Sequence, residues 1–589
     1  TAEVQERALS TLLWIVATIV GIVVTLPLDD WTVVARALDG AAIGETDPHL
    51  LRDIAFYVAH LPLEVTAYRW ALLSHALMAV VVVAGYALAR GIAWEEGTLR
   101  VTRHARRHLT VLGAIVLVLL AWSYRLDVFE RLAAGTGPEG SFGFADKSVA
   151  LPAALVLQVV TLSAAAVVGW SGWSRQPRSA IVAVTTVLLA ALLLRQGLPL
   201  IADSIAGGAD VVARERPYLQ ARASYSLRAY DAMRVGAAAV GDSGRLADIA
   251  PWDEPSLLRA LARRRPLVGG AVGLAWQDDG DGPRAYGFEE LPAAGTLARW
   301  RPVPLDPRAD DPIARVERDA DAAPLPPIAV LDGGGRYAVS ADPAGALAGP
   351  RLDEPLARLA AAWGLQNPRL AVGTLPAPAP TLVAVRDVRE RVRRLAPLLT
   401  PGRVVAPVVA LDSLWWVVEL YATSDRYPLS ERRIVAGTDV TAAQHAATAI
   451  VNAHTGRPVF VADPQPAPLA RAWARRVQPR PQPLGQLPEA LRAALPPDRD
   501  ALALQGGAAA RHGARPLEGG GFDVVQPDMG DTLAGGGPPL VWLADRRVWA
   551  ATALVIDSTR AVRAVLVAPG GRDRTIRVVP IEGGARLPS

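Results

Sequence analysis

Cysteine is absent from the 589-residue sequence, and lysine occurs once, as Lys147. Without thiols the chain can form no disulfide and no cysteine-ligated zinc, haem or iron–sulfur site. Histidine is scarce too, with 8 residues that form no tight cluster in the sequence. The 61 basic residues exceed the 57 acidic residues by 4, which is too small an excess to indicate a nucleic-acid partner. We therefore expect no cofactor, no metal and no nucleic acid.

Charge is sparse up to about residue 203 and frequent after it. Hydrophobic residues make up 51% of the chain, and its mean hydropathy of +0.23 is high for a purely soluble protein. A helix needs roughly 20 mostly apolar residues to cross a bilayer, because unpaired backbone groups are costly in lipid. Five segments meet this requirement, and they predict an α-helical transmembrane bundle within residues 1–203: Thr11–Leu28, Ala67–Trp94, Leu109–Tyr124, Val149–Trp173 and Ser179–Ala202.

The placement of arginine predicts the orientation of these spans. The first span lacks a basic leader and a cleavage site, so we interpret it as a retained helix. Two of the four connecting loops are basic, through Arg100, Arg103, Arg106, Arg107, Arg175 and Arg178, and the other two are acidic or mixed. Because basic loops stay in the cytoplasm, we expect the amino terminus inside and everything after Ala202 outside. The expected location is therefore a membrane that borders the cytoplasm, with the lipid bilayer as a partner.

Among the polar side chains inside the predicted spans, three are candidates for a function: His75, Gln158 and Arg195. Ionisable groups in lipid are costly and are often functional. Arg195 could instead extend to the membrane interface, and His75 could form a hydrogen bond to a neighbouring helix. We prefer these simpler interpretations, and the alternative is that the three residues line a transport path.

The remainder has short apolar stretches separated by Gly and Pro, which predicts a large α+β extracytoplasmic region. We divide it into a membrane-proximal segment (204–320), an α+β domain (321–500), and a Gly-rich segment with a C-terminal β region (501–589). The expected helices are Pro217–Val235, Glu254–Arg264, Leu352–Trp363, Val388–Leu399, Ala442–His454 and Leu469–Arg476. The expected strands are Pro327–Leu331, Tyr337–Ala341, Thr381–Val385, Val404–Val409, Leu414–Thr423, Pro458–Val461, Leu540–Leu543, Ala550–Ile556, Ala561–Val567 and Thr575–Pro580.

We expect one polar patch near the end of the most apolar of these strands, with members from the strand itself, from the residues after it and from the basic helix before it. Its members are Glu390, Arg391, Glu419, Asp425, Arg426 and Tyr427. Arginine and carboxylate groups of this kind could organise a polar site or a partner surface. Alternatively, the patch ends the strand and pairs charges to fix a turn, and we favour this second interpretation.

Two motifs resemble catalytic or metal sites but lack the residues that such chemistry needs. Gly241–Gly244 reads GDSG, as in the nucleophile segment of trypsin-like proteases, but every upstream His lies in the predicted membrane part or its loops. His445 and His454 are nine residues apart on an expected helix and would face different sides, so they do not form a metal pair. We therefore assign no catalytic residue and do not expect an enzyme.

Five blocks in order resemble uncharacterised protein family 0182, a group of bacterial multi-pass membrane proteins. Two of them read RERVRRLAPLLT (Arg389–Thr400) and WWVVELYATSDRYP (Trp415–Pro428). The others are DIAFYV at Asp53–Val58, ERPYLQ at Glu215–Gln220, and Val459–Phe460 with Asp463–Pro464. The resemblance implies a fold and a location, but it carries no established activity. Members of this family usually have about seven spans, as though two spans before Thr11 were lost or lay outside this sequence.

Two classes of function remain open. The first is a noncatalytic accessory or scaffold subunit of a membrane complex, whose partners are other membrane proteins; the lack of an assembled catalytic or cofactor motif favours it. The second is a transporter or lipid-handling protein that the extracytoplasmic domain gates, with His75, Gln158 and Arg195 along the path.

Overall fold

A computed structural model describes residues 14–25 in part, 31–95, 98–137, 140–174, 176–197, 211–237, 252–264, 272–312, 322–525 and 540–581, a few residues inside these ranges excepted. The chain divides into two compact units. The first comprises Thr1–Tyr225 and Ser424–Arg432, and the second comprises Ser226–Thr423 and Arg433–Ser589.

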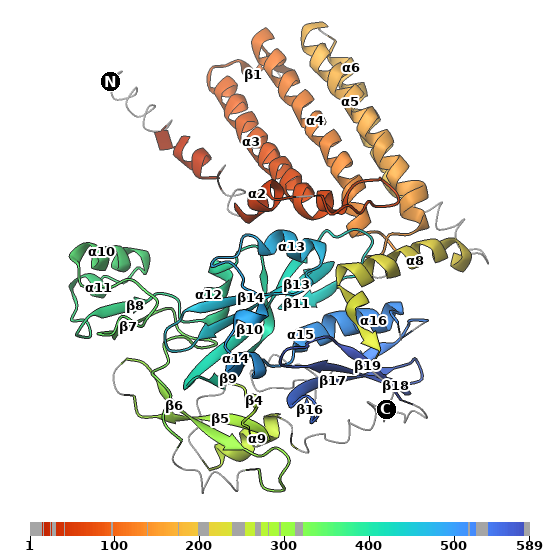
Figure 1. The fold of residues 1–589 in the computed structure, drawn as a ribbon. Coiled ribbons are helices and arrows are strands. Elements are labelled where there is room, and N and C mark those ends of the chain that lie inside the picture. Colours follow the sequence, from red (N-terminus) through yellow and green to blue (C-terminus); the bar gives the residue numbers. More distant parts are fainter. Residues whose placement is uncertain are drawn as a thin grey trace. The chain divides into compact units, whose positions relative to one another are not determined.

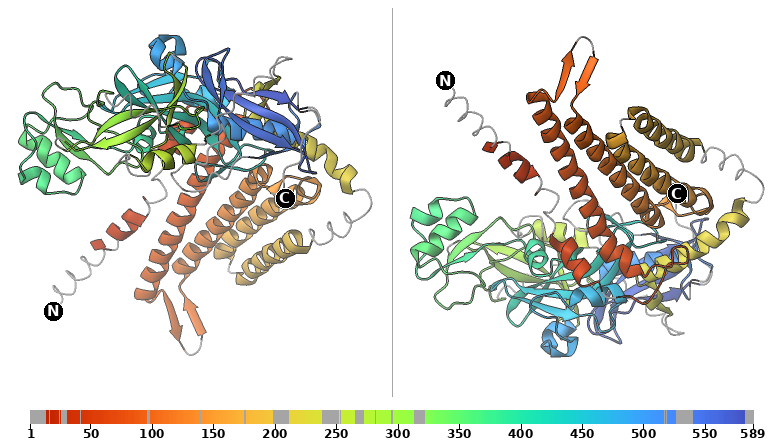
Figure 2. Two further views of the ribbon diagram at one scale, coloured as in Figure 1. Left: turned by 90° about the horizontal axis from the view of Figure 1, so that it is seen from below. Right: turned by 90° about the horizontal axis from the view of Figure 1, so that it is seen from above.

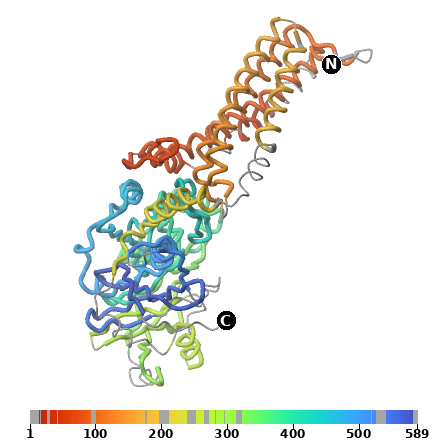
Figure 3. The backbone as a smooth tube through the Cα atoms, turned by 90° about the vertical axis from the view of Figure 1, so that its right-hand side faces the viewer, coloured from red at the N-terminus to blue at the C-terminus, as the bar shows by residue number. Residues whose placement is uncertain are grey.

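Long helices dominate the first unit and run side by side (Figure 1, Figure 3). They are α3 (Leu61–Leu88), α4 (Arg103–Ala133), α5 (Leu151–Ser174) and α6 (Pro177–Leu192), with wider helical turns at η2 (Phe56–His60), η4 (Asp146–Ala150) and η5 (Leu193–Gly197). With these turns, all four are long and apolar enough to cross a membrane. The second to fifth predicted spans are thus confirmed as long apolar helices. The first, Thr11–Leu28, lies largely outside the described residues.

Small residues allow α4 and α5 to approach each other closely. A Cβ at Gly172 would overlap Thr110, and a Cβ at Gly169 would lie 3.6 Å from Ala114. Leu117, Ala164, Ala165, Val168, Ala183 and Val187 form the buried core between α4, α5 and α6. Such small-residue contacts are typical of helices that associate in lipid, where packing replaces the hydrophobic effect.

A β-hairpin joins α3 to α4. Its strands are β1 (Ile92–Glu95) and β2 (Thr98–Val101), and they project from the ends of the two helices in Figure 2. α3 ends at Leu88, short of the predicted Trp94, because Arg90 adopts a left-handed φ of 53°. Thr102 then caps α4 by accepting a hydrogen bond from the backbone N–H of Ala105. A short helix, α2 (Trp31–Leu38), precedes η2.

The second unit contains three larger sheets. A four-stranded sheet has the order β14 (Pro458–Ala462), β13 (Ala442–Asn452), β10 (Ser413–Ser424), β9 (Thr400–Ala410). A six-stranded sheet has the order β15 (Asp523–Val525), β17 (Val548–Ile556), β18 (Val562–Pro569), β19 (Arg577–Pro580), β3 (Gly236–Ala237), with β16 (Leu540–Leu543) also on β17. The third is an antiparallel sheet of β4 (Ala275–Asp278), β5 (Pro283–Leu291) and β6 (Arg299–Leu305).

Shorter elements complete the description. The two-stranded sheets pair β7 (Ala338–Ala341) with β8 (Pro380–Val383), and β11 (Arg433–Val435) with β12 (Thr438–Val440). α8 (Val211–Ala229) connects the two units. The other helices are α9 (Glu254–Ala262), α10 (Pro355–Gly364), α11 (Arg369–Val372), α12 (Val388–Leu395), α13 (Pro468–Ala474), α14 (Glu489–Ala493), α15 (Arg499–Ala501) and α16 (Gly507–His512).

Most predicted strands are confirmed, but two predictions about this unit were wrong. Ala442–His454 was expected to be a helix, and most of it forms β13, whose residues are buried along the whole strand. Pro327–Leu331 makes only isolated bridges, at Ile328 and Leu331, in place of a strand. The sheet of β4, β5 and β6 was not predicted at all. β10 lies inside its sheet, as its continuously apolar sequence indicated.

Candidate functional site

A buried ion network lies on the four-stranded sheet. We define it as Arg234, Glu419, His445, Asp463 and Arg574. Glu419 comes from β10 and His445 from β13, whereas Asp463 directly follows β14. Arg574 comes from the loop between β18 and β19, so the network joins the two largest sheets.

His445 occupies the centre of this network. Its Nδ1 lies 2.7 Å from Asp463 Oδ2, and its Nε2 lies 2.9 Å from Glu419 Oε2. Burial by itself lowers the pKa of His445, but the hydrogen bonds to Asp463 and Glu419 outweigh burial and raise it to about 10. The imidazole is therefore a cation at neutral pH that donates from both nitrogens.

Two arginines balance the carboxylates. Arg574 pairs with Glu419 and donates to Thr448 Oγ1 at 3.0 Å, while Thr448 donates to Glu419 at 2.7 Å. Arg234 donates to both oxygens of Asp463, at 3.0 and 3.2 Å. Burial opposes ionisation of Glu419, but Arg574 and then His445 lower its pKa below the ordinary value. The pKa of Asp463 is lowered as well, against burial, by His445 and Arg234.

A second acidic pair borders the network. Tyr421 donates to Asp498 at 2.8 Å, and the backbone N–H of Val404 donates to Asp500 at 3.2 Å. Burial, and then the neighbouring charge of Glu419, raises the pKa of Asp498. Burial and the nearby Asp498 raise the pKa of Asp500 to about 6. The surroundings therefore disfavour the charged form of Asp498 and Asp500, whereas they favour the charged form of Glu419 and Asp463.

The same cluster can be tested as a metal site. Glu419, His445 and Asp498 each offer a ligand atom within 4.8 Å of the others. A metal ligand nitrogen must be unprotonated and free to face the metal, but each nitrogen of His445 already faces a carboxylate oxygen, of Asp463 or of Glu419. Arg574 already supplies the cation that faces Glu419. The donor set therefore fits an ion network better than a metal centre.

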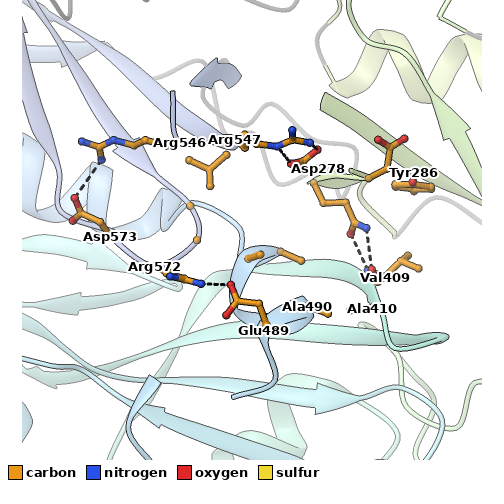
Figure 4. A pocket seen from close by; sticks show the side chains of 17 residues that line it. Asp278, Tyr286, Val409, Ala410, Glu489, Ala490, Arg546, Arg547, Arg572 and Asp573 are labelled. Carbon is orange, nitrogen blue, oxygen red and sulfur yellow. Dashed lines mark hydrogen bonds and ion pairs between the residues drawn. The ribbon is translucent and has the colours of Figure 1, made fainter. Parts of the chain in front are cut away.

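Two cavities are lined in part by the loop that carries Arg574. A small cavity of about 140 Å³ is lined by residues of the ion network. A cleft of about 840 Å³ is lined by residues of β4, β9, α14, β17 and the same loop (Figure 4). Arg572 and Asp573 line both cavities, so the position of this loop shapes them together.

Three ion pairs mark the cleft in Figure 4. Arg546 binds Asp573 at 3.2 Å, Arg547 binds Asp278 at 2.5 Å, and Arg572 pairs with Glu489. A side-chain amide supports one wall, because Gln277 donates to the carbonyl of Val409 at 2.9 Å and accepts from its N–H at 3.1 Å. A cleft of this size and rigidity is typical of small-molecule sites.

The structure distributes the predicted patch over three places. Glu419 belongs to the buried ion network. Glu390 is on the exposed face of α12, 3.0 Å from Arg393 and 2.9 Å from Arg394, whereas Arg391 donates to the carbonyl of Ala348 at 3.1 Å. Asp425, Arg426 and Tyr427 belong to the first unit, where Arg426 lies 3.6 Å from Glu130 and 3.4 Å from Asp425, and Tyr427 is buried.

The three candidate residues of the predicted spans lie on different helical segments: His75 on α3, Gln158 on α5 and Arg195 on η5. His75 is buried, with Nε2 3.0 Å from the carbonyl oxygen of Leu112. Arg195 pairs with Asp127 and lies over the Tyr124 ring, 4.9 Å from its centroid. Gln158 is half-buried on α5.

Sequence reasoning missed most of the network. Because Ala442–His454 was predicted to be a helix, the sequence did not place His445 on a strand beside β10. Glu419 did carry a signal, because a single carboxylate within a continuously apolar strand requires a buried cation nearby. Arg574 follows a Gly-rich turn 155 residues later in the chain, and no local pattern connects it to Glu419. The GDSG motif lies outside the described residues.

The protein therefore combines a unit of helices long and apolar enough to cross a membrane with a second unit of helices and sheets that contains a buried ion network. The chain belongs to the Uncharacterised protein family (UPF0182), whose sequence profile matches residues 1–250 and 344–510. This confirms the resemblance inferred from the five blocks. No solved structure matches the chain.

Relatives in this family come from several bacteria. A UPF0182 protein of Synechococcus sp. (strain JA-2-3B'a(2-13)) is 24% identical over 565 residues, covering 81% of this chain and 66% of the relative. One from Cupriavidus necator is 23% identical, covering 81% of this chain and 59% of the relative. One from Mycobacterium tuberculosis (strain ATCC 25618 / H37Rv) is 24% identical, covering 82% and 59%. The matched part of the chain thus spans about three fifths to two thirds of these relatives.

Proposed function

We propose that this chain is a noncatalytic accessory or scaffold subunit of a membrane protein complex, with its second unit outside the cytoplasm. The observation that carries the proposal is the state of His445, which holds a proton to a pH of about 10 and directs both ring nitrogens at carboxylates. A general base needs a free nitrogen and a pKa near the working pH. The network therefore suits a rigid framework better than catalysis.

Exposed apolar faces support a membrane position for the first unit. On α6, Ile181, Leu188 and Leu192 are 66%, 64% and 60% exposed, and similar side chains line α3. Soluble monomers rarely expose such large contiguous apolar surfaces. Lipid or neighbouring membrane helices would cover these faces.

Charge at the helix ends supports the orientation. The connection between α3 and α4 and the turn between α5 and α6 are at one end of the unit, with Arg100, Arg103, Arg106, Arg107 and Arg178. The opposite end holds Asp47, Asp53, Glu130 and Asp146. Since the basic end is expected in the cytoplasm, the chain that follows α6 leaves on the other side. This argument does not depend on the number of spans before α3.

A transporter or lipid-handling protein is the second candidate. Ion pairs between helices favour it, because Arg195 joins η5 to Asp127 of α4, and Arg125 of α4 joins Glu64 of α3. Against it, the side chain of His75 is buried, and its Nε2 lies within hydrogen-bond distance of the carbonyl oxygen of Leu112 on the neighbouring helix. The accessory role is therefore the better supported of the two.

Purification from native membranes tests the proposal. The tagged chain would be extracted in mild detergent, and everything that remains bound would be identified by mass spectrometry. The proposal predicts one or more membrane proteins in fixed stoichiometry that persist when the salt concentration is raised. A monodisperse chain without protein partners, carrying lipid or a small molecule, would contradict it and favour transport.

A further inference from the structure

The cleft in Figure 4 presents ion-paired basic and acidic side chains to a ligand, together with an apolar floor. Arg546, Arg547 and Arg572 each face a carboxylate of the same cleft. We propose that this cleft binds a neutral, hydroxyl-rich ligand, namely an oligosaccharide. The inference stands on the chemistry of the cleft alone and goes beyond the accessory role.

Charge balance within the cleft disfavours an ionic ligand. Its lining contains three arginines and four carboxylates, from Asp278, Asp279, Glu489 and Asp573. Asp279 also pairs outside this set, with Arg284 at 2.8 Å. An anion at one of these arginines would be repelled by the carboxylate that pairs with it, and a cation at a carboxylate would be repelled by its arginine, so an ionic ligand works against these pairs. A neutral ligand leaves all of them intact.

Hydroxyl groups can use both members of each pair at once. A hydroxyl oxygen accepts from an Arg N–H that the carboxylate does not occupy, and its proton is donated to a carboxylate oxygen. Hydrogen bonds to charged groups are stronger than those between neutral groups. Adjacent hydroxyls on a sugar ring match the close spacing of guanidinium and carboxylate groups in a pair such as Arg547 and Asp278.

The floor of the cleft has the other property that a sugar requires. Ala490 and Ala493 are exposed on α14, and their small side chains leave room for a ring. Val409, Ala410 and the aromatic ring of Tyr286 also line the cleft (Figure 4). The C–H faces of a pyranose can pack on such apolar surface while its hydroxyls reach the ion pairs.

The walls are held in place before any ligand arrives. Gln277 links β4 to β9 through its two hydrogen bonds with Val409, and Trp276 packs on Trp549 with their centroids 4.9 Å apart. The loop with Arg572 and Asp573 is anchored through Arg574, which pairs with Glu419. Preorganised walls reduce the entropy that binding costs.

Calorimetric titration of the full chain tests the proposal. The protein would be purified in an amine-oxide detergent, because alkyl glycosides carry the same chemistry as the ligand. The probes are maltotriose, cellotriose and triacetylchitotriose, with inorganic phosphate and triglycine as charged competitors. We expect at least one saccharide to bind and neither charged probe to do so.

Two matched variants identify the site. Ala493→Trp fills the cleft from an exposed helix position and should weaken saccharide binding by at least about tenfold. Ala360→Trp makes the same change on the exposed face of α10 and should leave binding unchanged. Failure of all three saccharides to bind, equal binding by both variants, or A493W-sensitive binding of phosphate or triglycine would each overturn the proposal. None of these results changes the outcome of the partner purification, so the two proposals fail separately.

Discussion

Glu419 shows how a carboxylate can lie inside an apolar strand. It is nearly fully buried, and an isolated charge there would be very costly. Arg574, His445 and Thr448 all contact it, so the charge is neutralised by groups from two other segments. Removing one member leaves the others unpaired, which is where the energetic penalty arises.

Glu419→Gln should therefore destabilise the protein strongly. Loss of its charge removes the carboxylate that pairs with buried Arg574 and leaves His445 with Asp463 alone, and breaking a buried pair in this way typically costs about 3 kcal/mol. Glu390→Gln is the matched control, because Glu390 pairs only at the surface and should cost less than about 0.5 kcal/mol. Intrinsic tryptophan fluorescence during heating measures both. Equal unfolding midpoints for the two variants would show that the network does not stabilise the fold.

His445→Gln should destabilise the protein in a pH-dependent way. Because folding raises the pKa of His445 from 6.5 to about 10, its proton contributes full stability below pH 6.5, and this contribution is lost as the pH rises through 10. The unfolding midpoint of H445Q should thus fall furthest below that of the natural chain at pH 6, and the gap should close toward pH 10.

The stability deficit of Glu419→Gln should depend on pH in the opposite direction. Folding lowers the pKa of Glu419, so its stabilisation is present above its ordinary value of 4.5 and is lost as the pH falls below that value. The deficit of E419Q should therefore shrink in acid, while that of H445Q shrinks in alkali. A pH-independent deficit for H445Q would mean that folding does not raise the pKa of His445.

At the scale of elements, β13 explains why its segment was misassigned. The sequence AAQHAATAIVN is rich in alanine, the residue with the highest intrinsic helix propensity. A strand buried on both faces shows no alternation of polar and apolar residues, so the usual strand signal was absent. β10 is buried in the same way, but its Trp and Val residues favour a strand and made it recognisable.

Where β4 approaches β9, the side chain of Gln277 forms the two hydrogen bonds with Val409 that a backbone partner would form in a sheet. Gln277→Leu removes both of its hydrogen bonds to Val409 and should cost about 2 kcal/mol, at roughly 1 kcal/mol each. Hydrogen exchange followed by mass spectrometry should show faster exchange in peptides that contain Val409. Gln486→Leu, on an exposed turn, is the control. Unchanged exchange in Q277L would mean that the two strands are held by other contacts.

At the scale of the whole molecule, hydropathy revealed the membrane-length helices because backbone groups in lipid must be satisfied within each helix. The positions of Arg90 and Thr102, which end α3 and begin α4, required the structure. Neither cavity could be predicted. Their walls come from segments that are as far apart as Asp278 and Arg547, and a single sequence carries no pairing signal over that distance.

Labelling of single cysteines tests most directly the proposal that the helices span a membrane and leave the second unit outside the cytoplasm. The natural chain has no cysteine, so one introduced cysteine reports one position without background. Ser558→Cys lies in an exposed turn after β17, and Gln176→Cys lies in the exposed turn between α5 and α6. Both variants would be treated in spheroplasts with a membrane-impermeant maleimide.

We predict that S558C is labelled in intact spheroplasts and that Q176C is labelled only after the membrane is permeabilised. Labelling of both denatured proteins to the same extent controls for expression and reactivity. The reverse pattern, with Q176C labelled in intact spheroplasts and S558C protected, would contradict the proposed orientation.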